Sequence, residues 1–331
     1  MFYKNITFQE RNEYVFEASL ANAMRLKLFS FHYYERLLDS YIEHVINLLV
    51  EKKYDISVKN SEEILFKEEN NLMKQVFKLV KDQDLKEYFS FPFDFFNLKY
   101  LYKGKIKEEN FEGFKLSSYG VLDKEKLKKL YQGEEIGNLP PILAQAMKDF
   151  NQDLSSKSPF ESDLLWDKYL HQFYLDQSQK LKSDYLFKIH SLKIDLLNVL
   201  NLFRIKSFDK EYKVYEKTFI KGGQLELYVL SDLYKEDSDV IAAKLAYLDY
   251  AEKIKKGLEG YKKTGSFSDL EKELEEYFLY YLSQGVNRFF GYEGIIAYYW
   301  LKANELSNLH LLLTAKENSI QKEWILQRIR V

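Results

Sequence analysis

Hydrophobic residues along this chain recur at the three-to-four-residue spacing of helices, and the alternation typical of strands never persists beyond a few residues. Proline is absent after Pro159, and only 13 Gly and 4 Pro interrupt the whole sequence, which favours long helices. The expected fold is therefore all-α. The pattern predicts helices over residues 11–38, 41–50, 61–81, 123–133, 163–182, 185–206 and 238–257, and two final helices on either side of Gly291.

Local breaks set the expected ends of these helices. Phe91-Pro92-Phe93 predicts a break directly before Asp94, which would then occupy an N-cap or first-turn position. Residues 155–159 are the most linker-like segment of the chain. Residues 268–271, Ser-Asp-Leu-Glu, have the form of a capping box and predict a helix start.

One polar and apolar pattern occurs three times, with starts 101 and then 110 residues apart. An acid is followed by Asn at +3, apolar residues at +4 and +7, and Lys at +11. So large a period predicts three copies of a domain-sized helical unit, over about residues 1–118, 119–222 and 223–331. The polar members are Asp94, Asn97 and Lys105 in the first copy, Asp195, Asn198, Arg204 and Lys206 in the second, and Glu305, Asn308 and Lys316 in the third.

Helical geometry gives this motif a direction. Eleven residues make three turns plus about 20°, so the acid and the Lys lie on one face with the apolar positions, while Arg204 at +9 points the opposite way. The acid is nearer the N-terminus and the cation nearer the C-terminus, as the helix dipole prefers. Two interpretations follow: the polar groups hold each repeat together, or they face a central opening and bind a partner. The first is favoured, because paired polar groups at helix ends are usually structural.

Composition narrows the class of protein. The chain has 331 residues, of which 46% are hydrophobic, and 49 Lys and Arg against 51 Asp and Glu give a net charge of −2. This balance argues against a nucleic-acid partner. The absence of cysteine excludes disulfides and a cysteine nucleophile. No signal peptide is recognised at the N-terminus, and apolar runs such as residues 295–301 are too short to cross a bilayer. We expect a cytoplasmic chain, at most peripheral to a membrane.

Signals for enzyme chemistry are weak. No Gly-x-x-x-x-Gly-Lys-[Ser/Thr] loop occurs, and Gly222-Gly223 is typical of a turn rather than a phosphate cradle. The five histidines show no metal-ligand spacing. The acidic runs at residues 237–239 and 273–276 fit solvated helix starts and faces. The sequence therefore predicts no catalytic centre, no cofactor and no metal.

Several segments, in order along the chain, resemble one family. Asp94-Phe-Phe-Asn97-Leu-Lys99, Asp195-Leu-Leu-Asn198 with Arg204, and the Gly-Gly turn at residues 219–223 are similar to stretches of the C-type subunits of V/A-type rotary ATPases. In eukaryotic V-ATPases the counterpart of these proteins is the d-type subunit. Leu139-Pro-Pro141 matches a further landmark, and residues 291–309 resemble the C-terminal signature. Departures from the family pattern occur at Ala303, His310, Ala315 and Leu326.

The resemblance implies a non-catalytic component of the central stalk. Members of this family are all-helical and funnel-shaped, with three similar domains about a pseudo-threefold axis. They sit on the membrane rotor ring, receive the coiled-coil shaft and its companion protein, and couple ATP hydrolysis or synthesis to proton or sodium transport. By resemblance the chain would be peripheral to the membrane through the ring. An unrelated helical scaffold or adaptor is the alternative left open by the residues alone.

Overall fold

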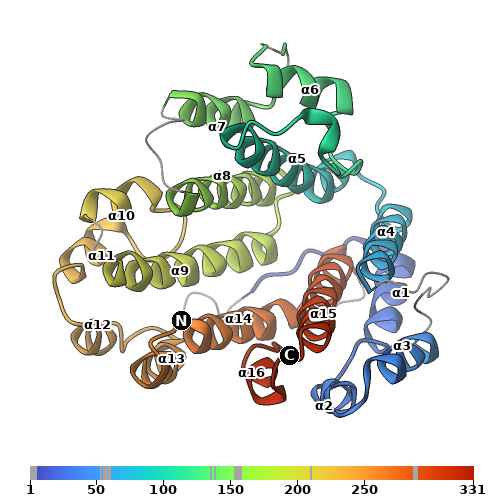
Figure 1. Ribbon diagram of the computed structural model, residues 1–331. Helices are drawn as coiled ribbons and strands as arrows, with labels where there is room; N and C mark the ends of the chain where they lie inside the picture. The colour runs from blue at the N-terminus through green and yellow to red at the C-terminus, as the bar shows by residue number, and fades with distance from the viewer. Residues whose placement is uncertain are drawn as a thin grey trace. The chain divides into compact units, whose positions relative to one another are not determined.

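The computed structural model describes residues 6–52, 54, 61–134, 136–137, 139–152, 159–208, 211–285 and 290–331. Every regular element in these residues is helical, with sixteen α-helices, and the prediction of an all-α fold is confirmed (Figure 1). The three longest helices are α5 (Gln83–Ile106), α9 (Asp184–Ser207) and α15 (Glu293–Glu317). Each of the three carries one copy of the repeated motif.

The chain divides into two compact units. Unit 1 combines Met1–Val80 with Glu236–Val331, so it contains both end segments of the chain, and unit 2 is Lys81–Lys235. This division follows contacts and not sequence repetition, so the three domains predicted with boundaries near residues 118 and 222 stay a prediction.

Unit 1 is built around α15, on which α1, α3, α4, α14 and α16 pack. Buried residues such as Ile296, Leu309 and Leu312 lie on several sides of α15, as expected for a helix surrounded by others. The other helices of this unit are α1 (Val15–Arg25), α2 (Phe31–Asp39), α3 (Ile42–Glu51), α4 (Ser61–Leu79), α12 (Ser238–Lys244), α13 (Ala251–Thr264), α14 (Ser268–Ser283) and α16 (Lys322–Leu326).

In unit 2, α8 (Pro159–Lys180) packs against both α5 and α9 (Figure 1). Aromatic rings fill these interfaces: Phe91 stacks on Phe173 with centroids 4.7 Å apart, and Tyr174 stacks on His190 at 4.5 Å. Large aromatic surfaces supply much of the energy of such packing. The shorter helices of unit 2 are α6 (Lys124–Gln132), α7 (Pro141–Gln152), α10 (Tyr212–Thr218) and α11 (Leu227–Leu233).

Most predicted helices are confirmed to within a few residues, but the N-terminal one is wrong. Residues 11–38 form two helices, α1 and α2, and not one. Ser30 ends the interruption between them, because its hydroxyl accepts a hydrogen bond from the backbone N–H of Tyr33 and caps α2. On α1 the side chains that become buried are Ala18 and Ala21. A local cap therefore overrides a pattern that would also suit a continuous helix.

The predicted break at Pro92 is also wrong. α5 passes through Pro92 without ending, so Asp94 lies in the middle of a helix and is not an N-cap. An internal proline costs about 3 kcal/mol. The cost is tolerated here because α5 is buried along much of its length, with residues such as Phe89 and Phe95 almost inaccessible to solvent.

Two further helix starts differ from the prediction. Residues 238–257 hold α12 and the first part of the separate helix α13, with turns between them, rather than one helix. The predicted capping box does not form, because the residue before α14 is Phe267 and makes no side-chain cap. The Ser268 hydroxyl instead contacts Ser266 and Arg328. The predicted linker at residues 155–159 lies almost wholly outside the described residues.

Candidate functional site

An asparagine on each motif helix holds a single residue of a separate segment by both of its backbone polar groups. In all three copies Nδ2 donates to the carbonyl oxygen of that residue and Oδ1 accepts from its N–H, at distances between 2.6 and 3.1 Å. All three asparagines are buried, so each amide satisfies groups that would otherwise lack partners. The pairs are Asn97 with Ser117, Asn198 with Ile220, and Asn308 with Arg330.

The acid of the first copy binds the backbone a little further along. The Asp94 carboxylate accepts hydrogen bonds from the N–H groups of Val121 at 2.9 Å and Leu122 at 3.0 Å. Gly120 makes this approach possible, since a β-carbon there would overlap the carboxylate. Burial raises the pKa of Asp94 to about 6, although the two N–H groups lower it. The Asp94 carboxylate thus binds backbone groups of its own chain.

The second copy repeats this arrangement in its own loop. Asp195 accepts hydrogen bonds from the N–H groups of Gln224 and Leu225, both at 3.0 Å. Gly223 takes the place of the first copy's glycine, because a β-carbon on it would also overlap the carboxylate. The two copies therefore share both the donors and the steric requirement for glycine.

The third acid has different partners. Glu305 accepts a hydrogen bond from the N–H of Phe29 at 2.5 Å and from the hydroxyl of Tyr54 at 2.7 Å. The ammonium group of Lys302 lies 2.7 Å from Glu305 and 3.1 Å from Glu68, and it also donates to the Tyr54 hydroxyl at 2.8 Å. The result is a largely buried cluster of two carboxylates, one ammonium and one phenol.

The lysine at +11 lies at the C-terminal end of a short helix. Lys206 donates to the carbonyl oxygen of Tyr234, the residue that ends α11. Lys316 donates to the carbonyl oxygens of Leu38 and Ser40, at 2.8 and 2.6 Å, where α2 ends. The negative end of a helix dipole favours a cation at this place.

The first copy has its lysine in the corresponding position. A β-carbon on Gly133, the left-handed C-cap of α6, would lie 4.0 Å from Nζ of Lys105. Arg204 has a different environment, near Asp167 of α8, where it and Lys99 lower the pKa of a carboxyl that burial raises. We call the set of acid, asparagine and lysine on one motif helix a clamp. The three clamps lie on α5, α9 and α15.

Ion pairs join α5 to α8. Lys99 lies 3.2 Å from Asp163 and 3.3 Å from Asp167, and Lys103 lies 2.8 Å from Asp163. All four side chains are partly exposed, so each pair contributes at most about 1 kcal/mol. These charges position two helices and are paired with one another.

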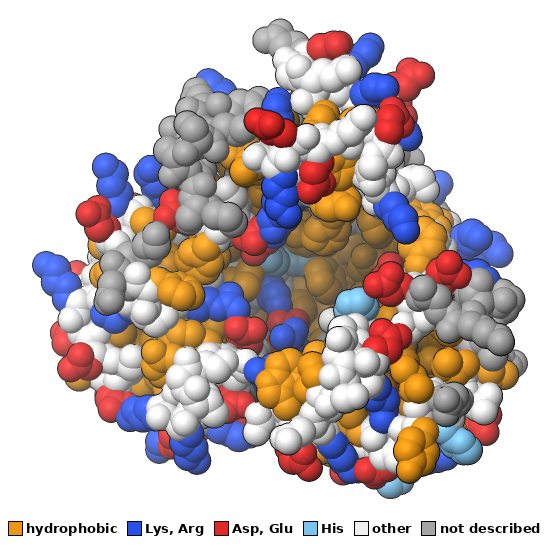
Figure 2. All heavy atoms as spheres, in the orientation of Figure 1, with side chains coloured by type: hydrophobic (Ala, Val, Ile, Leu, Met, Phe, Trp, Pro, Cys, Tyr) orange, Lys and Arg blue, Asp and Glu red, His pale blue; other side chains and the backbone are white. Residues whose placement is uncertain are grey.

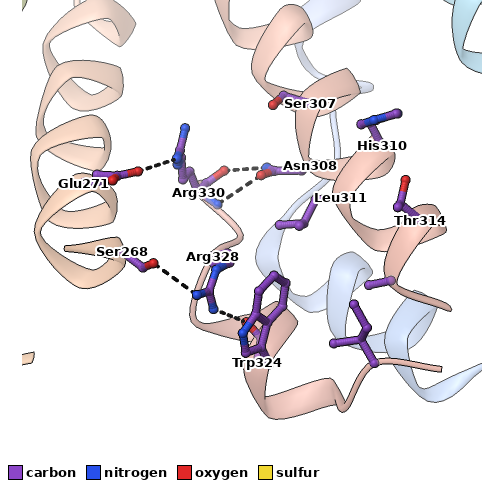
Figure 3. Close-up of a pocket in the computed structure, with 12 residues that line it drawn as sticks. Ser268, Glu271, Ser307, Asn308, His310, Leu311, Thr314, Trp324, Arg328 and Arg330 are labelled. Atoms are coloured by element: carbon purple, nitrogen blue, oxygen red, sulfur yellow. Dashed lines mark hydrogen bonds and ion pairs between the residues drawn. The ribbon is translucent and has the colours of Figure 1, made fainter. Parts of the chain in front are cut away.

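A pocket of about 340 Å³ borders the third clamp, between α14, α15 and the segment around α16 (Figure 3). Its two arginine side chains contact other residues that line the pocket. The guanidinium of Arg328 lies 3.5 Å from the centre of the Trp324 ring and donates to the Ser268 hydroxyl at 3.1 Å. That of Arg330 lies 4.0 Å from Glu271. Both guanidinium groups thus contact other residues that line the pocket.

Two further features, metal-binding clusters and membrane-spanning helices, are absent from the residues that the structure describes. Among the residues that the structure describes, no group of three or more His, Asp or Glu side chains could hold a metal ion. No helix in that part of the chain is long and apolar enough to span a membrane. On the described part of the face shown in Figure 2, positive and negative side chains are interspersed, and neither sign forms a continuous patch.

The motif residues were found from the sequence, but their partners were not. Those partners are mostly backbone groups, which carry no residue signature. The signal available was the glycine that precedes the bonded N–H groups, Gly120 in one copy and Gly223 in the next. Nothing in the sequence pattern pointed to Tyr54 or Glu68 as partners in the third clamp.

The fold and its clamps define an all-helical protein whose recurring polar groups bind its own backbone. The chain matches the model of the ATP synthase (C/AC39) subunit family over residues 18–328, and it belongs to that family. A comparison with curated proteins gave no significant match. Membership in this family makes the chain a component of a rotary ATPase and removes the alternative of an unrelated helical scaffold.

Proposed function

We propose that this chain is a non-catalytic central-stalk component of a V/A-type ATPase, seated on the membrane rotor ring and receiving the central shaft. In this role it couples ATP hydrolysis or synthesis in the soluble head to ion movement through the ring. The observation that carries the proposal is the family match, which extends over residues 18–328 and so includes all three motif helices.

The structure of each unit suits the transmission of torque. α5, α9 and α15 have 24 or 25 residues, which corresponds to about 36 Å of helix. Each long helix is tied to neighbouring segments by a buried clamp, and buried polar bonds of this kind resist sliding of one element along another. A stiff body with wide contact surfaces serves this role better than a ligand pocket.

The proposed partners are the ring of membrane proteins, the coiled-coil shaft and the companion protein of that shaft. A funnel of three similar domains about a pseudo-threefold axis belongs to this proposal. In it, the clamps hold each domain together, and the partners are bound by other residues. The chain itself would then be attached to the membrane only through the ring.

Affinity purification of a tagged chain from detergent-solubilised membranes of its own cells tests this role. We expect the ring and the stalk proteins to co-purify, and removal of the chain to leave ATP hydrolysis by the soluble head without ion transport. A chain that stays monodisperse and binds neither ring nor shaft would disprove the proposal.

A graded test uses Asp195→Asn, which replaces a buried acceptor by an amide and weakens the second clamp. We expect a lower ratio of ions moved to ATP hydrolysed, since a looser body transmits less torque. Asp239→Asn is the matched control, because Asp239 pairs with Lys262 on the exposed surface. If both variants, once shown to be folded and assembled, couple as well as the unmodified chain, then the stiffness of unit 2 does not contribute to coupling.

A further inference from the structure

Three short helices, α2, α6 and α11, share one pattern of burial. Each follows a buried residue whose N–H donates to the acid of a clamp. Counted from that residue, the positions at +5 and +8 are buried in all three cases. The three sets are Phe29, Tyr34 and Leu37; Leu122, Leu127 and Leu130; and Leu225, Leu230 and Leu233.

The clamp lysines extend the correspondence to the other end of each helix. Lys316 binds the carbonyl oxygens at +9 and +11 from Phe29. Lys206 binds the carbonyl oxygen at +9 from Leu225, and Lys105 lies beside Gly133, at +11 from the first copy's donor. An acid therefore holds the start of each short helix, and a lysine lies at its end.

The connection along the chain differs in one copy. α6 and α11 each come after their own motif helix in the sequence, with α10 between α9 and α11, and the bonded N–H groups lie 28 and 30 residues after the acid. Phe29 lies 276 residues before Glu305, and the carbonyl group of Leu38 lies 278 residues before Lys316. The third clamp thus grips a helix from the opposite end segment of the chain, within unit 1.

We infer that the third copy is completed by a segment that does not follow it in the sequence and is held to it by non-covalent contacts alone. The clamp on α15 is then a docking site whose ligand is residues 29–40 of this same chain. The site recognises an amphipathic helix by the N–H before its first turn, the carbonyl groups after its last turn, and an apolar stripe between them. Tyr34 and Leu37 supply that stripe, and an ion pair between Lys322 and Asp39 adds a second hold on the end of α2.

The third clamp is adapted to this ligand. Two residues before Phe29 stands Lys27 rather than glycine, and the acid is Glu305 rather than aspartate. The longer side chain places the carboxylate further from its helix, so the approaching backbone needs no glycine. The ammonium group of Lys302 then neutralises the buried negative charge of Glu305. The first two copies have Phe91 and Leu192 at the position of Lys302.

Hydrogen exchange on the full-length chain tests the docking. Lys316→Met removes the donor at the end of α2, and we expect exchange in residues 31–39 to become about tenfold faster or more, with α4 and α13 unchanged. Lys206→Met is the matched control at the same motif position: it should affect α11 and leave α2 unchanged. If α2 keeps its protection in Lys316→Met, or if all of unit 1 exchanges in step, the helix is not a separable ligand and the inference is overturned.

A second experiment tests whether the chain connection is needed. A specific protease sequence is inserted between Tyr54 and Ser61 of the full-length protein, which is cut after purification and separated by size. We expect the N-terminal fragment to stay bound in the unmodified clamp and to dissociate in Glu305→Gln with Lys316→Met. Loss of the fragment from the unmodified protein, or its equal retention in the double variant, would overturn the inference. Neither result depends on the role proposed in the ATPase.

Discussion

Asparagine suits the +3 position of each clamp because its short amide presents a donor and an acceptor at a fixed separation. Asn198 uses both on Ile220 while its own carbonyl oxygen accepts from the Tyr215 hydroxyl. Aspartate would lose the donor, and glutamine would place the amide too far from its helix. The acid and the asparagine thus make different hydrogen bonds: the carboxylate only accepts them, and the amide both donates and accepts.

The glycine opposite each aspartate gives a sharp prediction. Gly223→Ala should lower the free energy of unfolding by about 2–4 kcal/mol, because the new β-carbon displaces the Asp195 carboxylate and leaves buried polar groups unpaired. Urea titration measures the change. Gly113→Ala is the control, since nothing lies within 4 Å of a β-carbon there. In an Asp195→Ala background the same glycine change should cost much less; an undiminished cost would mean that the overlap with the carboxylate is not the cause.

The buried charges of the third clamp give another prediction. Lys302→Met should destabilise the protein by about 3–5 kcal/mol, because Glu305 and Glu68 would then share a buried site without a cation. The free energy of unfolding, measured at neutral pH, checks this. Lys262→Met removes a cation from an exposed pair with Asp239 and should cost less than about 1 kcal/mol. Equal costs for the two variants would contradict a role for burial.

At the scale of elements, helices were predictable where the signal is local. α6 begins after Asp123, whose carboxylate accepts from the N–H of Lys126, and ends at Gly133 in the left-handed conformation, as its sequence indicates. The continuity of α5 through Pro92 was not predictable, because packing of α5 against α8 decides it. Propensity is a weak guide wherever tertiary contacts oppose it.

The short helices show the same limit for the candidate site. The acid, asparagine and lysine of each copy were identified from spacing alone, because helical periodicity fixes which residues share a face. Their partners depend on where a segment returns, and periodicity says nothing of that. For the third copy the partner segment lies at the other end of the sequence, around Phe29. A repeat of this kind can be counted from sequence, but spacing alone does not say which segment each copy binds.

At the scale of the whole molecule, the two units differ in the solvent exposure of their histidine side chains. In unit 2, His171 of α8 and His190 of α9 are buried beside the ring of Tyr174, and His190 also lies against Tyr88 of α5. Burial lowers the pKa of His171 to about 3 and that of His190 well below its usual value. The three histidines of unit 1, His32, His44 and His310, are exposed. Acid should therefore act on the two units unequally.

Because the unfolded chain binds protons near pH 6.5 and these two buried imidazoles do not, their contribution to stability is fully present above pH 6.5 and is lost as the pH falls towards 3. Asp94, with a pKa raised to about 6, acts in the opposite sense below that pH. We expect unit 2 to lose about 1–2 kcal/mol of unfolding free energy per pH unit near pH 6.

Trp166 is the single tryptophan of unit 2, so its fluorescence in a Trp300→Phe, Trp324→Phe background reports the urea unfolding of that unit. His171→Leu removes one titrating ring with no hydrogen bond to Nδ1 and should lower the slope by more than half, because the opposing contribution of Asp94 remains. His310→Leu should leave the slope unchanged; an unaltered slope in His171→Leu would show that this histidine is not the source.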